Sequence, residues 1–143
     1  LIQNGLNGTL PVAMGEILTE IQIIELSNNW ISSTIPRTFK NLQQLQILRL
    51  AENEMEGAVP EQIWSFSKLE FIDLGGNKFR GSIPDSIGDL VKLQSLRLYD
   101  NRFAGTLPVS MSQLRTLQRL EISNNFLHGT VPLWLAMLER AKL

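Results

Sequence analysis

The chain has 143 residues, 43% of them hydrophobic and 19% charged, which is enough for one ordinary domain with a sizeable buried core. Thirteen basic residues oppose fourteen acidic ones, and this balance argues against nucleic acid or an anionic membrane surface as the partner. The longest apolar run, residues 133–138, is far shorter than the roughly 20 residues of a membrane span, and the absence of cysteine excludes disulfides and thiolate chemistry.

One sequence motif recurs along the chain. In full it reads L-x-L-x-x-N-x-L-x-G-x-I-P; the first of six copies lacks its leading residues, and in the second Ser33 replaces the glycine. The asparagines follow one another at steps of 25, 24, 24, 24 and 24 residues: Asn4, Asn29, Asn53, Asn77, Asn101 and Asn125. A fixed period of this length is typical of a solenoid, in which each repeat stacks on the next.

Each copy begins with a predicted strand, such as residues 24–26 and 48–50, in which every second side chain points inward. The asparagine follows, where backbone amides lose their sheet partners, and we expect the six asparagines to form a ladder that satisfies those groups. The glycine permits a turn, and a second short strand is expected between this glycine and the proline. After the proline, apolar residues at steps of three predict a helical turn on the outer wall.

These motifs resemble the plant-specific subclass of the leucine-rich repeat family, with its G-x-I-P ending and 24-residue period, over essentially the whole chain. The resemblance implies an α/β fold: a leucine-rich repeat solenoid, curved as a right-handed superhelix, with a parallel β-sheet on the concave face and short helical turns on the convex face. Members include ectodomains of receptor-like kinases, receptor-like proteins and polygalacturonase-inhibiting proteins. The resemblance therefore implies a non-enzymatic recognition module, extracellular or at the cell surface, that binds a peptide or protein on its concave face.

We expect residues 1–143 to form one domain of about six repeats, the first incomplete, with residues 133–143 as a C-terminal helical cap. The chain begins at Leu1, halfway through a repeat and without a signal segment, and it lacks the cysteine pairs that cap extracellular members of the family. We therefore expect a piece of a longer protein, with flanking repeats or another subunit as further partners.

The middle residues of the predicted strands are charged and alternate in sign from repeat to repeat: Glu25, Arg49, Asp73, Arg97 and Glu121. Neighbouring parallel strands lie about 4.8 Å apart, so each charge is expected beside an opposite one. One interpretation is a self-neutralising row whose exposed pairs add roughly 0 to 1 kcal/mol each. The other is a polar ligand that binds along the row by replacing these pairs.

An apolar stripe of Ile23, Ile47 and Phe71 runs beside this row and marks either a partner surface or an edge covered by the outer helical segments. Gly75 and Gly76 are expected to leave a bare notch, which Phe71 and Tyr99 border and which would anchor a ligand side chain. The predicted ligand-binding residues on the concave face are Ile47, Arg49, Phe71, Asp73, Arg97, Tyr99, Asp100 and Glu121.

Little in the sequence supports catalysis, and we expect no enzyme activity, no cofactor and no metal site. His128 is the single histidine and there is no cysteine, so a zinc cage or a Ser-His-Asp triad lacks parts. Asp73 and Glu121 could suggest the carboxylate pair of a glycosidase, but they stand two strands apart with Arg97 between them. An adjacent cation lowers the pKa of a carboxyl group, whereas the general acid of a glycosidase needs a raised pKa. Asn7 begins an N-x-[ST] sequon and is the predicted glycosylation site.

Two functions from different classes remain open. The chain is either a recognition module or a structural piece that assembles into a larger solenoid or complex and has no ligand of its own. A third interpretation, ice binding through the threonine column before the prolines, is disfavoured because Ala58 and Ser82 interrupt that column.

Overall fold

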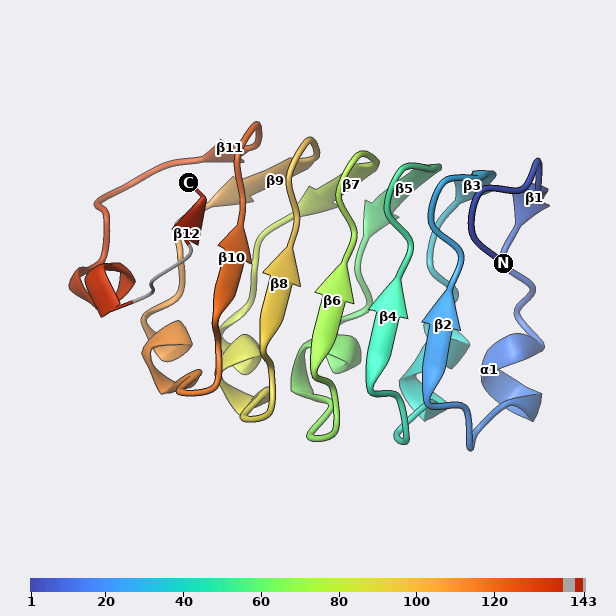
Figure 1. The fold of residues 1–143 in the computed structure, drawn as a ribbon, viewed down its shortest axis with the longest axis horizontal. Coiled ribbons are helices and arrows are strands. Elements are labelled where there is room, and N and C mark those ends of the chain that lie inside the picture. Colours follow the sequence, from blue (N-terminus) through green and yellow to red (C-terminus); the bar gives the residue numbers. More distant parts are fainter. Residues whose placement is uncertain (138–140, 143) are drawn as a thin grey trace.

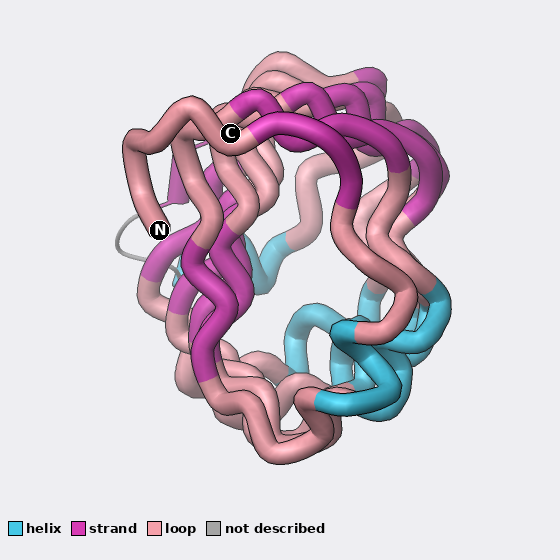
Figure 2. Tube along the Cα trace, turned by 90° about the vertical axis from the view of Figure 1, so that its right-hand side faces the viewer, coloured by secondary structure: helices cyan, strands magenta, loops and turns pink. Residues whose placement is uncertain are grey.

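The computed structural model describes residues 1–137, 141 and 142 of the chain. The backbone winds repeatedly around one axis, and the coils stack side by side along it (Figure 1). Figure 2, which looks along the stack, shows strands on two sides of each coil and the helical turns on another. This arrangement confirms the predicted α/β solenoid.

The concave sheet carries the first strand of each repeat. All its pairings are parallel, and its order is β12-β10-β8-β6-β4-β2. The strands are β2 (Ile23–Glu25), β4 (Ile47–Arg49), β6 (Phe71–Asp73), β8 (Ser95–Arg97), β10 (Arg119–Glu121) and β12 (Ala141–Lys142).

The second sheet is also parallel and runs in the order β1-β3-β5-β7-β9-β11. Its strands are β1 (Asn7–Thr9), β3 (Trp30–Ser33), β5 (Glu54–Ala58), β7 (Lys78–Gly81), β9 (Arg102–Gly105) and β11 (Phe126–Leu127). Five of these strands begin directly after a ladder asparagine. We had expected the second strand of each repeat to lie between the glycine and the proline, and that expectation was wrong. The ladder asparagine of the next coil binds this segment, and strand pairing can therefore begin before the glycine.

In the residues that the structure describes, the convex side consists of one α-helix, α1 (Met14–Ile17), and of 3₁₀ turns that begin right after the prolines, as the steps of three predicted. These turns are η1 (Arg37–Asn41), η2 (Glu61–Ser65), η3 (Asp85–Asp89), η4 (Val109–Gln113) and η5 (Leu133–Met137). The predicted cap over residues 133–143 is described only in part, because residues 138–140 and 143 lie outside the described residues.

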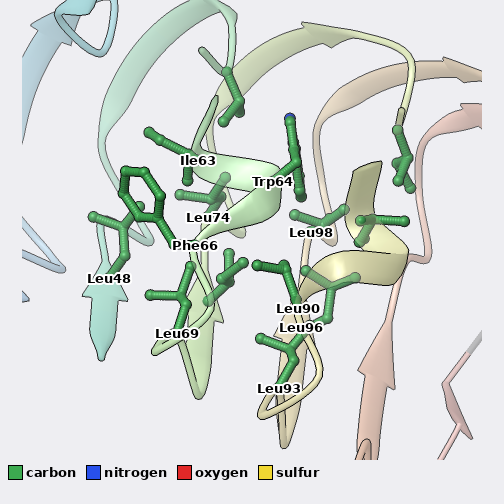
Figure 3. Packing of buried hydrophobic residues seen from close by; sticks show 14 of the residues in the cluster. Leu48, Ile63, Trp64, Phe66, Leu69, Leu74, Leu90, Leu93, Leu96 and Leu98 are labelled. Atoms are coloured by element: carbon green, nitrogen blue, oxygen red, sulfur yellow. The ribbon is translucent and has the colours of Figure 1, made fainter. Parts of the chain in front are cut away.

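The core fills the space between the sheets and the helical turns, and leucine side chains from successive coils pack on one another there (Figure 3). Leu48, Leu69 and Leu96 are fully buried, and Trp64 packs its ring edge-on against Phe103, with the ring centroids 6.4 Å apart. Burial of large apolar side chains against neighbouring coils is the main stabilisation of a solenoid, since a single coil has no interior of its own.

The asparagine ladder is visible in the hydrogen bonds at the turn after each concave strand. Asn53 Nδ2 donates to the carbonyls of Leu26 and Leu50, each at 3.0 Å, and its Oδ1 accepts from the N–H of Ile31 at 2.9 Å. The same pattern joins neighbouring coils at Asn29, Asn77, Asn101 and Asn125. Asn4 does not follow it: this side chain is exposed and donates to the Ile2 carbonyl at 2.8 Å.

Candidate functional site

The register of the concave sheet sets the predicted binding residues side by side in two rows. Arg49 pairs in register with Glu25 on one side and with Asp73 on the other, and Arg97 likewise stands between Asp73 and Glu121. One position earlier, the stripe continues from Ile23 through Ile47 and Phe71 to Ser95 and Arg119. The residues between the two rows point inward and are buried, which leaves both rows on the concave surface.

Arg97 is the centre of the charged row. Its Nη1 lies 2.5 Å from Asp73 Oδ2 and its Nε lies 2.8 Å from Glu121 Oε2. Arg119 Nη2 also binds Glu121, at 2.6 Å from Oε1. Asp73 and Glu121 are buried, so both carboxylates depend on these cations for the hydrogen bonds that water would otherwise supply.

The two carboxyl groups differ in their pKa shifts. Burial raises the pKa of Asp73 above its ordinary value, although the charge of Arg97 and the N–H of Gly75 act in the opposite direction. Burial also opposes ionisation of Glu121, but hydrogen bonds from Arg97 and Arg119 outweigh it and hold the pKa of Glu121 below its ordinary value. The difference follows from the second arginine, which reaches only Glu121.

The alternation of charges is interrupted between β4 and β6. Arg49 Nη1 binds Glu25 Oε2 at 3.0 Å, and its guanidinium lies 5.8 Å from the centre of the Phe71 ring. Arg49 and Asp73 lie side by side in register, as expected, but within the described part of the chain no ion pair joins them. Arg97 already holds Asp73, and the long Arg49 side chain leans the other way, toward Glu25.

A hollow of about 270 Å³ opens at this interruption. Four of the predicted binding residues line it together, namely Arg49, Phe71, Asp73 and Arg97. Ile47, Tyr99, Asp100 and Glu121 are not among its lining residues. We call this region the concave hollow. It combines an aromatic face with guanidinium and carboxylate groups, which suits a ligand that has both apolar and polar parts.

The expected bare notch at Gly75 and Gly76 is not empty, and that prediction was wrong. The Tyr99 ring lies on Gly75, where an added Cβ would stand 2.1 Å from Tyr99 Cε1. The Tyr99 hydroxyl donates to Glu52 Oε1 at 3.0 Å, so this side chain crosses a whole coil. Burial and this hydrogen bond raise the pKa of Tyr99 to about 12. Glu52 was not predicted, because no repeat-level pattern connects residues two coils apart.

Arg97 also contacts Tyr99, with its guanidinium 4.9 Å from the ring centre. Asp100, the next residue, sits in a left-handed turn with φ 50° and accepts a hydrogen bond from Asn124 Nδ2 at 2.6 Å. Tyr99 and Asp100 therefore flank the concave surface at the ends of its strands, outside the hollow. In the apolar stripe, Ile23 is 55% exposed, while Ile47 and Phe71 are half-buried.

The remaining predicted residues lie on other surfaces. Asn7 is exposed in β1, and His128 is exposed at the turn after β11, where its backbone N–H donates to the Gly105 carbonyl at 2.9 Å. In the described residues, no group of three or more His, Cys, Asp or Glu side chains is arranged to hold a metal ion. Nor does any helix in that part of the chain have the length and apolar character of a membrane span.

Comparisons with known proteins identify relatives of this chain. Two family models match it, both described as leucine rich repeat, one over residues 19–79 and the other over residues 92–114 and 116–138. No curated protein matches the chain in sequence.

Among solved structures, the plant peptide hormone receptor RGFR1 in complex with RGF2 is similar over 93% of this chain and 21% of its own, with 34% identity and a TM-score of 0.89. The ectodomain of the receptor kinase SOBIR1 from Arabidopsis thaliana matches over 92% of this chain and 71% of its own, with 30% identity and a TM-score of 0.85. The Arabidopsis receptor kinase HAESA, in complex with the peptide hormone IDA and the co-receptor SERK1, has 32% identity over 92% of this chain and a TM-score of 0.87. This chain spans about a fifth of the receptor chains RGFR1 and HAESA, 21% and 22% respectively.

Proposed function

The chain belongs to the leucine-rich repeat family, in its plant-type subclass, and on that basis we propose that it recognises a peptide or protein partner through its concave sheet. The solved relatives are plant receptor ectodomains, and two of them hold peptide hormones, which supports a ligand-binding repeat module. Because ectodomains of this family are generally non-enzymatic, we propose that the module acts by binding alone.

The concave hollow is the observation that carries the proposal. Its residues come from neighbouring strands, and the Arg49 side chain is 42% exposed, with donors beyond the one that binds Glu25. A ligand that places an apolar group on Phe71 and a hydrogen-bond acceptor on Arg49 displaces water from both without breaking the Asp73–Arg97 pair. We propose that the predicted ligand-binding residues Ile47, Tyr99 and Asp100 contribute to the surface around the hollow, and that the buried Glu121 contributes by holding Arg97 and Arg119 in place.

Selection from a random linear peptide display library on the immobilised chain tests this proposal. Sequences that the wild-type chain enriches are re-tested on the double variant Arg49→Ala/Phe71→Ala and on a control, Arg80→Ala, whose side chain is exposed on the second sheet. We expect enriched peptides to lose binding to the double variant and to keep it on the control. Failure to enrich any sequence, or equal binding to the double variant, would contradict the concave site.

We also propose an extracellular or cell-surface location, with Asn7 as a glycan acceptor. The relatives are ectodomains of plant membrane receptors, and the Asn7 side chain is exposed at the edge of the second sheet. Secretion of the chain from a eukaryotic host, followed by glycosidase treatment of wild type and Asn7→Gln, tests the modification. A loss of mass is expected for the wild type alone.

Assembly without a ligand is the second candidate function, and one observation favours it. The coil that contains α1 exposes several apolar side chains, among them Ile17 at 75%, Val12 at 59% and Ile23 at 55%. Flanking repeats or another subunit would cover them in such an assembly. Light scattering after size exclusion, over a concentration series, separates the two functions, since a recognition module stays monomeric and an assembly piece self-associates.

A further inference from the structure

A second hollow, of about 390 Å³, lies where the concave strands β2 and β4 turn into β3 and β5. Trp30, Glu52 and Glu54 line it, together with Asn28 and Gly76. We call it the Trp30 hollow. None of the predicted ligand-binding residues lines it, so the inference below does not rest on the function proposed above.

Trp30 has no role in the core. It is the first residue of β3 and is 65% exposed, although it is one of the largest apolar side chains in the chain. The equivalent positions in the next three repeats carry the charged residues Glu54, Lys78 and Arg102. Phe126, at the same position of the last repeat, is also exposed, but it does not line this hollow. An aromatic side chain exposed beside a hollow is available for a partner.

Glu52 presents a carboxylate that the fold holds in place. Its Oε1 accepts the Tyr99 hydroxyl at 3.0 Å, and its carboxyl carbon would stand 2.6 Å from a Cβ added at Gly76, so the group lies flat on that glycine. Among the described residues, its second oxygen accepts no hydrogen bond. Tyr99 and Gly76 together therefore hold the Glu52 carboxylate beside the hollow, and neither of them neutralises the charge of this carboxylate.

The charge of the hollow is negative. Its described lining residues include two carboxylates and no basic side chain. Lys78 Nζ lies 3.6 Å from Glu54 Oε2, but both side chains of this pair are about half exposed, and such exposed pairs are weak. An anion would be repelled here, and an apolar group would desolvate the carboxylates without compensation. A cation would be attracted both by the two carboxylates and by the face of the Trp30 indole.

We propose that the Trp30 hollow binds a cationic side chain, arginine or lysine, of a peptide or protein partner. The cation stacks on the Trp30 indole and pairs with the carboxylates of Glu52 and Glu54. Guanidinium and ammonium groups share this chemistry, and the stacking of a planar guanidinium on the indole favours arginine.

Nuclear magnetic resonance of the isotope-labelled chain tests the proposal, with the indole N–H signal of Trp30 as the readout. The chain has three tryptophans, and Trp30→Phe assigns the signal. The probe is a capped hexapeptide of alternating glycine and arginine. Two comparison peptides replace arginine with lysine or with citrulline, which keeps the shape of arginine and lacks its charge.

We expect the arginine peptide to shift the Trp30 signal saturably, the lysine peptide to do so more weakly, and the citrulline peptide to leave it in place. Added salt should weaken the interaction. Glu54→Gln should lower the affinity about threefold, as expected for one partly exposed ion pair. The matched control is Glu56→Gln, which makes the same charge change on β5 at an exposed residue outside the hollow.

The proposal is overturned if the Trp30 signal does not move, if citrulline moves it as far as arginine does, or if Glu56→Gln weakens binding as much as Glu54→Gln. The signal of the buried Trp64 indole keeps its position in every folded variant, so misfolding is detected separately.

Discussion

Asn101 is held inside its turn by four hydrogen bonds. Its Oδ1 accepts from Phe79 N–H at 2.9 Å, and its Nδ2 donates to the carbonyls of Leu74, Leu98 and Tyr99. Asn101→Ala leaves these buried backbone groups unpaired, and each such group costs about 1 to 3 kcal/mol. We therefore expect the free energy of unfolding to fall by about 2 to 4 kcal/mol in urea titrations.

Asn4→Ala is the matched control for that substitution. The same residue type at the same repeat position is exposed there and bonds to Ile2, so we expect a change within about 0.5 kcal/mol. Equal losses of stability in both variants would mean that the ladder does not hold the coils together.

Tyr99 is the single tyrosine of the chain, so its ionisation can be followed directly by ultraviolet absorbance. Burial and the bond to Glu52 raise its pKa to about 12, from the value of 10.0 in an unfolded chain. A raised pKa means that the neutral hydroxyl is favoured in the folded state. Its contribution to stability is therefore complete below pH 10.0 and is lost as the pH rises through about 12.

We expect the native chain to titrate near pH 12, the denatured chain near 10.0, and Glu52→Gln in between. Circular dichroism at each pH verifies that the chain is still folded. A native midpoint near 10.0 would contradict the half-buried, hydrogen-bonded position of Tyr99.

Single residues that repeat with the period could be predicted from the sequence, and residues that break it could not. The places of the ladder asparagines and prolines follow from the 24-residue step, as do the rows on the concave sheet. The contact of Tyr99 with Glu52 joins residues 47 positions apart, and it depends on a side-chain direction that periodicity does not encode. For Trp30 a signal existed: an aromatic residue at a position where the next three repeats carry charged residues.

At the scale of elements, the coils that carry β6 and β8 interlock through Gly75. An added Cβ at this position would overlap the Tyr99 ring, with Cζ only 2.3 Å away. Gly75→Ala must therefore displace the ring, and we expect a loss of about 1 to 3 kcal/mol by thermal or urea unfolding. Gly5→Ala is the control, since a Cβ there meets nothing within 4 Å.

A double-mutant cycle separates this overlap from the ordinary effect of losing a glycine. In the Tyr99→Ala background, Gly75→Ala should be nearly neutral, because the clashing ring is gone. If Gly75→Ala costs the same in both backgrounds, the ring does not rest on this residue.

The pairing of elements was more predictable than the pairing of charges. The alternation in Ile24 to Leu26 requires a buried strand face, and stacking then fixes the register between coils. Whether Arg49 turns toward Glu25 or Asp73 is not fixed in this way, because both carboxylates are one strand away. The structure leaves the Asp73 side of Arg49 open, and the concave hollow exists for that reason.

At the scale of the whole molecule, stability should vary along the stack. In a solenoid each coil contacts only its neighbours, and an end coil opens at a lower free energy than a central one. The amides of Leu26 and Leu74 make equivalent bonds, to the carbonyls of Arg49 at 2.9 Å and Arg97 at 2.8 Å. We expect native-state hydrogen exchange to be faster at Leu26 in the isolated chain. Equal exchange free energies would indicate that all coils unfold together.

The central claim, recognition through the concave sheet, is tested most directly by mapping a selected peptide on the isotope-labelled chain by nuclear magnetic resonance. We predict that the largest shifts occur on β4, β6 and β8, at Arg49, Phe71, Asp73 and Arg97, and that the 3₁₀ turns η2 and η3 are unaffected. Shifts concentrated on those turns or on the second sheet, with the concave strands unchanged, would contradict recognition through this face.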